Sequence, residues 1–393
     1  VAPANLPSGL HLPIREQHEV AYAHARAHPE LFPPAQLKAG LDKEMHKMFE
    51  GMQVLELVTD ADKQVTKDAL FVPSMILSKQ KYHPNGDKDT VSCRFAMIGP
   101  RTDPAMWGDT SAATADEATT ICCMSAFQAD AVAHNYVRDL GYESFDVCGA
   151  FLHVDLVSPV QIITRIPTGI DHPYAGCLCV VRKSCYGLRQ SNKAFADDFD
   201  ANIKAAGFVP TRDPCVYMRI EEHPDGAHLP KRRCYLFTHV DDGKAMFNYR
   251  PFYDQLIAVL ERRYGKLRKG PLVGFTGTTF VKHDNGAFTR TQEGYILRFL
   301  NSVGVADLTI VRAPSQSDLF GDTSSSPLCD RTLYRTLIGS LIHTLRTRYD
   351  IQKEVVFLSS RSAAPTEADM AKVSLVLRYL LGSASYGPTY YTT

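Results

Sequence analysis

The chain has 393 residues, of which 45% are hydrophobic, 22% charged and 10% aromatic, and its 43 Lys and Arg residues balance 43 Asp and Glu residues. This composition excludes disordered, collagen-like and coiled-coil proteins, and the length allows two or three domains. No apolar run approaches the roughly 18 residues that cross a bilayer, so we expect no membrane partner. The balanced charge argues against a general nucleic-acid binder but leaves room for a local basic groove.

The first predicted elements lie in residues 1–140. Residues 1–35 are rich in Pro and His without a clear period, so we expect an N-terminal arm with at most one short helix. Apolar residues at helical spacing predict a helix over 37–51. The strand-like runs ALFVPSMILSKQ and TVSCRFAMIG flank the turn signal HPNGDKD and indicate a β-hairpin. A helix or helix pair is expected over 116–140.

The middle of the chain alternates strands and helices. The segment YESFDVCGAFL predicts a strand in which Asp146 stands between apolar neighbours. Apolar residues at four-residue spacing before Gly207 predict a helix over 193–206. Three short strands follow, with the sequences CVYMRI, RRCYLFTHV and KAMFNY, and the tip between the last two is Asp241-Asp242-Gly243. They predict an antiparallel sheet.

The last third of the chain is mostly helical in pattern. A helix over 251–264 precedes a hairpin, VGFTGTTFVKHDNGAFTRTQ, with its turn at Asn285-Gly286. Further helices are predicted over 292–302, 331–345, 351–362 and 366–381. The mixture of hairpins and helices along the whole chain predicts the α+β class.

Three carboxylates are the candidate catalytic and metal-binding residues. Asp241 and Asp242 lie at the predicted hairpin tip, and Asp146 precedes them by about a hundred residues. Crowded carboxylates are costly unless a cation neutralises them, and hard divalent ions take oxygen ligands. If the two strands are neighbours, the three could hold two Mg²⁺ ions, as in-line nucleotidyl transfer uses. On spacing alone, Asp-Asp-Gly is more often a solvated turn.

Eight separated segments form a further pattern along the chain: FDVCGAFLHVDL, IPTGI, VRKSCYGLRQSNKAF, GFVPTRDPCVYM, LFTHVDD, GFTGTTFVKHDNGAFTRTQEGYI, LYRTLIGSLIHTLRTRYDI and LRYLLGSASYGPTYY. In the same order, these segments resemble blocks of the reverse transcriptase of copia-type LTR retrotransposons, and SCRFAMIG is a fainter ninth. The resemblance covers 37–391 and implies a right-hand polymerase fold with fingers, a palm built on an antiparallel sheet, and a helical thumb or connection. It places the fingers in 36–135, the palm with an interleaved fingers segment in 136–270 and the thumb-like region in 271–393, without an RNase H domain in this chain.

The resemblance implies an RNA-directed DNA polymerase that extends a primer by nucleotidyl transfer, with two Mg²⁺ or Mn²⁺ ions. Asp146, Asp241 and Asp242 are then the metal ligands. The residues implied at the incoming deoxynucleoside triphosphate are Phe151, which would exclude a 2′-hydroxyl, Gln190 and Arg94. Those implied at nucleic acid are Arg189 and His239. Lys266 and Arg268 belong to a basic cluster over 262–269 that is a candidate for a local groove along nucleic acid, although such a cluster is more often a solvated face. Without the resemblance, Phe151 would be plain core, Gln190 a surface residue and Arg94 a strand-edge residue.

Several positions depart from the family's pattern. His239 replaces the tyrosine before Val-Asp-Asp, and Ser92 replaces a lysine two residues before Arg94. Asn192 and Tyr349 replace prolines, and Phe195 replaces a tryptophan. These changes leave three hypotheses: a working polymerase; a domesticated, catalytically weak or inactive domain that binds RNA or protein; and an unrelated two-metal nucleotidyltransferase. The second predicts a metal site that is empty or paired with Lys or Arg.

The expected partners and compartment follow from these hypotheses. A polymerase would bind an RNA or DNA primer-template and deoxynucleoside triphosphates, and other polyprotein products or a host complex could join it. Ten cysteines without a CxxC pair predict free thiols in a reducing compartment. We expect the cytoplasm for a retroelement particle, and the nucleus or an organelle for a domesticated protein.

Overall fold

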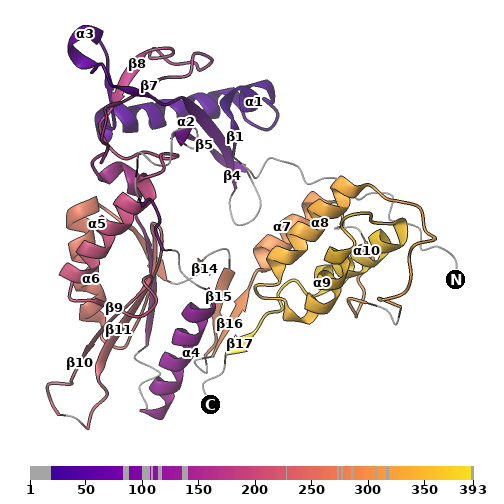
Figure 1. Ribbon diagram of the computed structural model, residues 1–393. Coiled ribbons are helices and arrows are strands. Elements are labelled where there is room, and N and C mark those ends of the chain that lie inside the picture. Colours follow the sequence, from indigo (N-terminus) through magenta and orange to yellow (C-terminus); the bar gives the residue numbers. More distant parts are fainter. Residues whose placement is uncertain are drawn as a thin grey trace. The chain divides into compact units, whose positions relative to one another are not determined.

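The computed structural model describes residues 19–82, 88–99, 107, 109–113, 117–134, 140–226, 228–271, 274–275, 278–284, 287–305, 308–315 and 318–390. They form two compact units (Figure 1). The larger unit comprises the described residues of 15–122 and 139–270, and the smaller unit those of 123–138 and 271–393. Helices and strands occur in both, which confirms the predicted α+β class.

The first part of the larger unit packs helices on two small sheets. One sheet has the order β1-β4-β5 and the other β2-β8-β7-β3. The elements are β1 (Val20–Ala21), α1 (Tyr22–Ala27), α2 (Pro34–His46) with its π-helical extension Lys47–Gly51, β2 (Leu55–Leu57), α3 (Ala61–Gln64), β3 (Leu70–Phe71), β4 (Ser74–Tyr82), β5 (Lys88–Met97), β7 (Ile162–Arg165) and β8 (Leu178–Val181). The predicted helix and hairpin are confirmed; most of the turn signal between β4 and β5 lies outside the described residues.

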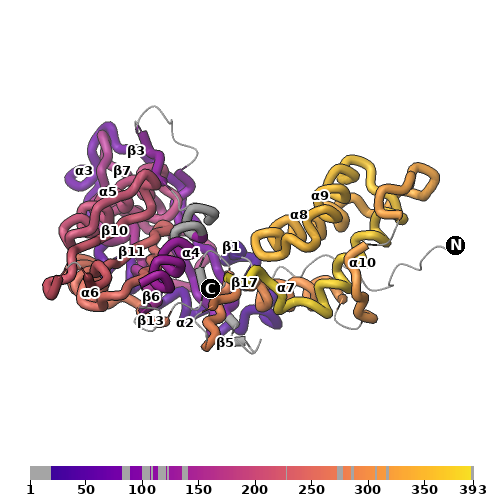
Figure 2. Tube along the Cα trace, turned by 90° about the horizontal axis from the view of Figure 1, so that it is seen from below, coloured from indigo at the N-terminus to yellow at the C-terminus, as the bar shows by residue number. Residues whose placement is uncertain are grey.

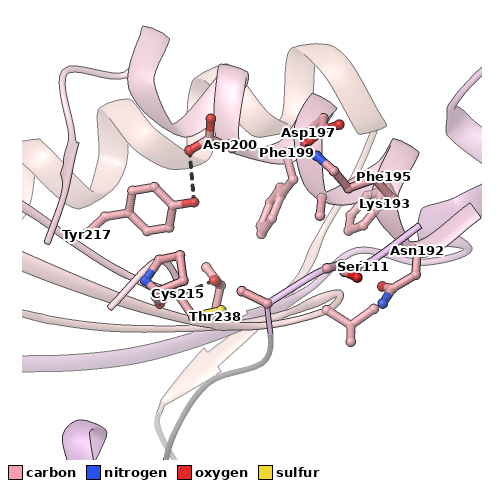
Figure 3. Close-up of a pocket in the computed structure, with 15 residues that line it drawn as sticks. Ser111, Asn192, Lys193, Phe195, Asp197, Phe199, Asp200, Cys215, Tyr217 and Thr238 are labelled. Carbon is pink, nitrogen blue, oxygen red and sulfur yellow. Dashed lines mark hydrogen bonds and ion pairs between the residues drawn. The ribbon is translucent and has the colours of Figure 1, made fainter. Parts of the chain in front are cut away.

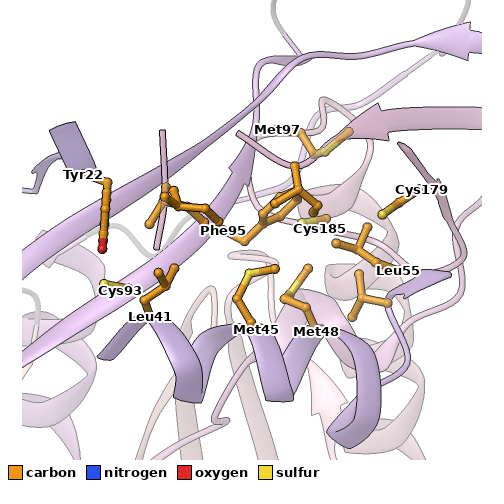
Figure 4. Close-up of a cluster of buried hydrophobic side chains, with 14 of the residues drawn as sticks. Tyr22, Leu41, Met45, Met48, Leu55, Cys93, Phe95, Met97, Cys179 and Cys185 are labelled. Atoms are coloured by element: carbon orange, nitrogen blue, oxygen red, sulfur yellow. The ribbon is translucent and has the colours of Figure 1, made fainter. Parts of the chain in front are cut away.

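The core under these sheets explains the helical pattern. Leu41 and Met45 of α2 and Met48 of its π-helical extension project toward Phe95 of β5 and the nearby Cys185 (Figure 4). All five are 1% exposed or less. Burying such side chains stabilises the fold by roughly 1.5–3 kcal/mol each.

The arm predicted over 1–35 is wrong for its described part, although the single short helix within it, α1, is confirmed. From Val20 the chain pairs β1 with β4, and Tyr22 and Phe32 are buried in the same core as Phe95. Sparse apolar residues without a period gave no local signal, because their partners lie in a sheet formed by distant residues. Residues 1–18 lie outside the described part.

The central sheet of the larger unit carries the carboxylates. Its strand order is β13-β6-β12-β11-β10-β9. The strands are β6 (Gly141–Asp146), β9 (Val209–Pro210), β10 (Val216–Glu221), β11 (Arg232–His239), β12 (Asp242–Phe247) and β13 (Arg268–Pro271). The sequence β6, α5, β11, β12, α6, β13 is a split βαβ arrangement to which β9 and β10 add an edge hairpin. The three predicted strands and their antiparallel pairing are confirmed.

Two helices cover one face of this sheet (Figure 1). They are α5 (Ser191–Ala205) and α6 (Arg250–Tyr264), close to the predicted bounds. Phe195 and Phe199 of α5 share a buried cluster with Leu256 of α6 and Leu236 of β11. The helices thereby support the sheet, and the carboxylates stand at the ends of its strands β6 and β12.

The smaller unit combines a helix group with a short sheet. Its sheet has the order β14-β15-β16-β17. Figure 2 shows α8 beside α9, and the two helices are in contact. The elements are β14 (Gly274–Phe275), β15 (Thr278–Lys282), β16 (Phe288–Thr291), α7 (Glu293–Ser302), α8 (Arg331–Thr344), α9 (Gln352–Ser360), α10 (Glu367–Gly382) and β17 (Thr389–Tyr390). The four predicted helices are confirmed, whereas the predicted turn at Asn285-Gly286 lies outside the described residues.

The helix α4 (Glu117–Ala133) lies within the segment predicted over 116–140, and the division between the units falls inside it.

Polar caps explain where two of the later helices begin. Asp330 accepts hydrogen bonds from the backbone N–H groups of Thr332 and Leu333 at the start of α8. Thr366 and Asp369 form a reciprocal capping box at α10. Among the described helices, none is sufficiently long and apolar to span a membrane.

Candidate metal centre and nucleotide site

The three predicted carboxylates come together at the end of the central sheet. Asp146 is the last residue of β6 and lies directly opposite Asp242, the first residue of β12. Asp241 belongs to the two-residue turn between β11 and β12. One ligand oxygen from each of the three lies within 4.8 Å of the others. The hairpin and its neighbouring strand therefore create one acidic cluster from residues that are distant in sequence.

Backbone contacts fix the spacing of this cluster. The N–H of Val147 donates to the carbonyl of Asp241 at 3.0 Å, which extends the β6–β12 pairing past the strand ends. Val240, the other turn residue, has φ 57°, a left-handed conformation that is rare for a β-branched residue. Strain of this kind persists where surrounding structure enforces it, and it is common at functional sites.

The glycine after the two aspartates has a packing role. An added Cβ at Gly243 would lie 2.1 Å from the ring of Phe145, the residue opposite it on β6. The ring of Phe145 can therefore lie over residue 243 of the neighbouring strand only because that residue has no side chain. This requirement accounts for the glycine of the Asp-Asp-Gly sequence.

The electrostatics of the cluster are unfavourable without a cation. Desolvation, together with the charges of Asp241 and Asp146, raises the pKa of Asp242 to about 6. Desolvation and the charge of Asp146 also raise the pKa of Asp241. Carboxylates with raised pKa values in a cluster are typical of functional sites.

Two further side chains reach Asp146. The Arg268 guanidinium, on the neighbouring strand β13, places Nε 3.6 Å from Oδ2 of Asp146. The Cys148 thiol donates to the same oxygen at an S···O distance of 3.6 Å. Arg268 was expected at nucleic acid; its contact with Asp146 is of the kind that the hypothesis of a domesticated domain predicts, whereas the contact of Cys148 was not predicted.

The predicted nucleotide residues form an aromatic and cationic group beside the carboxylates. Phe151 lies in a 3₁₀ helix (Ala150–His153) and packs edge-to-face on Tyr186 at 5.3 Å. The guanidinium of Arg94 lies 4.6 Å from the centroid of the same Tyr186 ring and also pairs with Glu19 at 3.1 Å. The charge of Arg94 lowers the pKa of Asp241, and the charge of Asp241 raises the pKa of Tyr186, so this group and the acidic cluster are electrostatically connected.

Gln190 is the most unusual polar residue of the site. It is only 7% exposed, and neither its amide nitrogen nor its amide oxygen has a hydrogen-bond partner among the described residues. Buried amides normally have partners, so an unsatisfied one indicates a place for a ligand or water. The prediction that Gln190 is a surface residue in the absence of the resemblance is wrong.

The other predicted nucleic-acid residues are spread around the site. His239 ends β11 and pairs across the hairpin with Asp242. Arg189 is half-buried beside Gln190, and Lys266 is exposed between α6 and β13. Ser92 keeps a hairpin contact, because its hydroxyl donates to the carbonyl of Lys79 at 3.3 Å.

A cavity of about 220 Å³ lies behind the hairpin turn, between α5 and the sheet (Figure 3). Val240 and Thr238 line it from the hairpin, and Tyr217 lines it from β10. The Tyr217 hydroxyl donates to Asp200 of α5 at 3.1 Å, the contact drawn in Figure 3. The strained residue Val240 therefore contacts open space on the face of the sheet that α5 covers.

Sequence reasoning missed two residues of the nucleotide group. Tyr186 stands in CYGLRQ, a segment from which only Arg189 and Gln190 were selected, and its aromatic ring beside a glycine was the available signal. Burial raises the pKa of Tyr186 to about 12, so the hydroxyl stays neutral. Glu19 gave no signal, because it lies in a segment without a periodic pattern.

Comparisons with known proteins agree with the sequence resemblance. No family model matches the chain. The chain is 25% identical over 312 residues to the retrovirus-related Pol polyprotein from transposon RE1 of Arabidopsis thaliana, and 28% identical over 262 residues to that from transposon TNT 1-94 of Nicotiana tabacum. These matches cover 78% and 62% of the chain but 20% and 19% of the relatives, so the chain spans about a fifth of their length.

A solved structure of a foamy viral protease-reverse transcriptase in complex with double-stranded DNA is similar over 98% of this chain and 53% of that one, with 12% identity and a TM-score of 0.45. The sequence matches confirm the predicted resemblance. The chain is homologous to the retrovirus-related Pol polyproteins of copia-type plant transposons.

Proposed function

We propose that the chain is an RNA-directed DNA polymerase domain that extends a primer by nucleotidyl transfer. The observation that carries this proposal is the convergence of Asp146, Asp241 and Asp242, with one oxygen from each within 4.8 Å of the others. The relatives supply the reaction class, since they are Pol polyproteins of transposons.

The donor set fits Mg²⁺ or Mn²⁺. It consists of carboxylate oxygens, which hard divalent cations prefer, and the raised pKa values of Asp241 and Asp242 reflect negative charge that a cation would neutralise. Two such ions, when bound, would lower the pKa of the primer 3′-hydroxyl and stabilise charge on the phosphates.

The chain's own residues would bind and orient the nucleotide. In the reaction, the primer 3′-oxygen forms a bond to the α-phosphorus, the bond to pyrophosphate breaks, and the hydroxyl proton leaves. Arg94 would neutralise charge on the departing phosphates. Phe151, held by Tyr186, would lie against the sugar and exclude a 2′-hydroxyl, and the unpartnered amide of Gln190 would hydrogen-bond to the nucleotide.

The domain bounds, the nucleic-acid contacts and the partners are proposed on the same basis. The fingers would lie in 36–135, the palm in 136–270 and the thumb-like region in 271–393, with Arg189, His239, Lys266 and Arg268 facing nucleic acid. The central sheet with α5 and α6 supports the palm assignment, since it carries the carboxylates. The partners would be a primer-template and deoxynucleoside triphosphates, and the compartment would be a cytoplasmic retroelement particle.

Primer extension tests the proposal. The unaltered chain is given an RNA template, a DNA primer, deoxynucleoside triphosphates and either Mg²⁺ or Mn²⁺. We expect extension by this protein and by the matched control Asp254→Asn, whose carboxylate lies on the exposed side of α6. We expect none from the double variant Asp241→Asn, Asp242→Asn. Equal extension by the double variant would place the chemistry elsewhere.

A domesticated binding module is the second candidate, and one observation favours it. Arg268 contacts Asp146, as expected for a metal site in which a basic residue takes the place of the cation. The changes at His239 and Ser92 point the same way. Absence of extension from a folded protein that still binds RNA would favour this module over the polymerase.

A further inference from the structure

We propose that Arg268 couples the metal centre to nucleic acid: it holds Asp146 in the free protein and moves to a phosphate when nucleic acid binds, which frees Asp146 for the cation. This inference rests on the metal centre of the proposed function. It adds a positioning residue and a mechanism by which the two ligands favour each other.

The strand β13 gives Arg268 this position. It pairs with β6 at the edge of the central sheet, so a residue at its start lies beside the end of β6 where Asp146 stands. The next residue, Lys269, is engaged elsewhere, since its ammonium is 2.7 Å from Glu261 of α6. Successive side chains of a strand point to opposite faces, which explains why only the first of these two cations reaches the carboxylates.

The contact is suited to exchange. Nε of Arg268 lies 3.6 Å from Oδ2 of Asp146, while 73% of the arginine side chain is exposed. An exposed ion pair is weak and a competing charge displaces it readily. Guanidinium groups also bind phosphate in a bidentate manner, so a nucleic-acid backbone is a better partner than one carboxylate oxygen.

A cation and the guanidinium compete for Asp146. A divalent ion on the carboxylates would repel the positive charge of Arg268, and Arg268 on Asp146 opposes the ion. A phosphate that withdraws Arg268 removes this opposition. By thermodynamic linkage, nucleic acid must then strengthen metal binding by the same factor by which the metal strengthens nucleic-acid binding.

Mn²⁺ binding to the free protein tests the first half of the inference. Free Mn²⁺ is measured by electron paramagnetic resonance during titration of the full chain, Arg268→Gln and the control Lys269→Gln. We expect Arg268→Gln to bind Mn²⁺ about threefold to tenfold more tightly than the unaltered chain, because one competing charge is removed. The control should be unchanged. Thermal melts confirm that all three proteins are folded.

The second half needs an RNA–DNA hybrid duplex, at a fixed concentration, in the same titration. Mn²⁺ uptake by the duplex itself is identical for all variants, so differences between them report the protein site. We expect the duplex to tighten Mn²⁺ binding by the unaltered chain and by Lys269→Gln, and to have a smaller effect on Arg268→Gln.

Two outcomes would overturn the inference: unchanged or weaker Mn²⁺ binding by Arg268→Gln, or an equal duplex effect in all three proteins. Its failure is separable from that of the proposed function. Primer extension together with unchanged Mn²⁺ affinity in Arg268→Gln would reject only the coupling. Tighter Mn²⁺ binding without any extension would reject only the polymerase.

Discussion

The acidic cluster of the larger unit and the Arg348–Asp350 ion pair of the smaller unit differ in how their charges are balanced. In the smaller unit, Arg348 is completely buried and pairs with both oxygens of Asp350, at 2.9 and 2.7 Å. Its remaining donors meet the carbonyl and hydroxyl of Ser383, and Tyr379 donates to Asp350 at 2.8 Å. In the larger unit, three carboxylates crowd together, and the exposed guanidinium of Arg268 pairs with one of them, Asp146.

The pKa values report this difference. Burial alone would raise the pKa of Asp350, but the hydrogen bonds and charge of Arg348 and the Tyr379 hydroxyl hold it below its usual value. The pKa values of Asp241 and Asp242 are raised instead. Fully paired charges are typical of a structural role, and crowded charges of like sign are typical of a ligand site.

Removing the paired charge should have the largest effect on stability. Arg348→Ala leaves Asp350 and the carbonyl of Ser383 without their main donor inside the protein. We expect a loss of about 1–3 kcal/mol in the free energy of unfolding, measured by urea denaturation, because Asp350 is partly solvated and keeps the Tyr379 donor. Lys353→Ala, at an exposed cation on α9, is the control and should be near neutral. A loss below about 1 kcal/mol for Arg348→Ala would contradict the structural role.

Neutralising the crowded charge should have the opposite sign. Without metal at pH 7.5, Asp241→Asn, Asp242→Asn should stabilise the larger unit by about 1 kcal/mol, after allowance for solvent screening at the exposed Asp242. That corresponds to a melting temperature higher by about 2–4 °C.

The pH dependence of this gain follows from the raised pKa of Asp242, about 6. Its ionisation destabilises the folded state, so the penalty is absent below the ordinary carboxyl range and grows as the pH rises through about 6. The gain in melting temperature of the double variant should therefore shrink at pH 4.5.

Mn²⁺ should raise the melting temperature of the unaltered chain but not that of the double variant. An equal rise in the variant would show that the ion binds elsewhere.

A soft metal sharpens the comparison further, because Cys148 adds a sulfur atom beside the carboxylates. Thiolates select soft cations over Mg²⁺. We expect Cys148→Ser to weaken Cd²⁺ binding about fivefold and to leave Mg²⁺ binding unchanged, as measured by calorimetry. Cys177→Ser, at another partly accessible cysteine, is the control. Equal Cd²⁺ affinity in both variants would exclude the thiol from the site.

The smallest effect concerns the strained turn. Glycine accepts φ 57° without steric cost, so Val240→Gly should relieve strain while losing the valine contacts along the cavity wall. We expect a change within about 1 kcal/mol in the free energy of unfolding. Destabilisation beyond about 2 kcal/mol would mean that the packing of the valine side chain outweighs the backbone strain at this position.

Local patterns predicted much of this architecture. The helices α5, α6, α8 and α10 follow from their residue patterns, with Gly207 as the predicted stop of α5, and the β11–β12 hairpin follows from its strand residues. The resemblance correctly grouped Asp146 with Asp241 and Asp242, which spacing alone left open. By contrast, the contacts of Arg268 with Asp146 and of Arg94 with Tyr186 join elements distant in the chain. They depend on strand order, which no local pattern encodes.

The hydrogen bond from Val147 to the carbonyl of Asp241 has a consequence for how a cation would enter. It ties the turn to the strand that carries Asp146, so the spacing of the carboxylates is already set before an ion binds. Chain ordering is completed during folding, and little conformational entropy is left to lose on ion capture. Loading should therefore be fast and should leave amide exchange of the central sheet almost unaltered, with Val147 already among the slowly exchanging amides of the apoprotein.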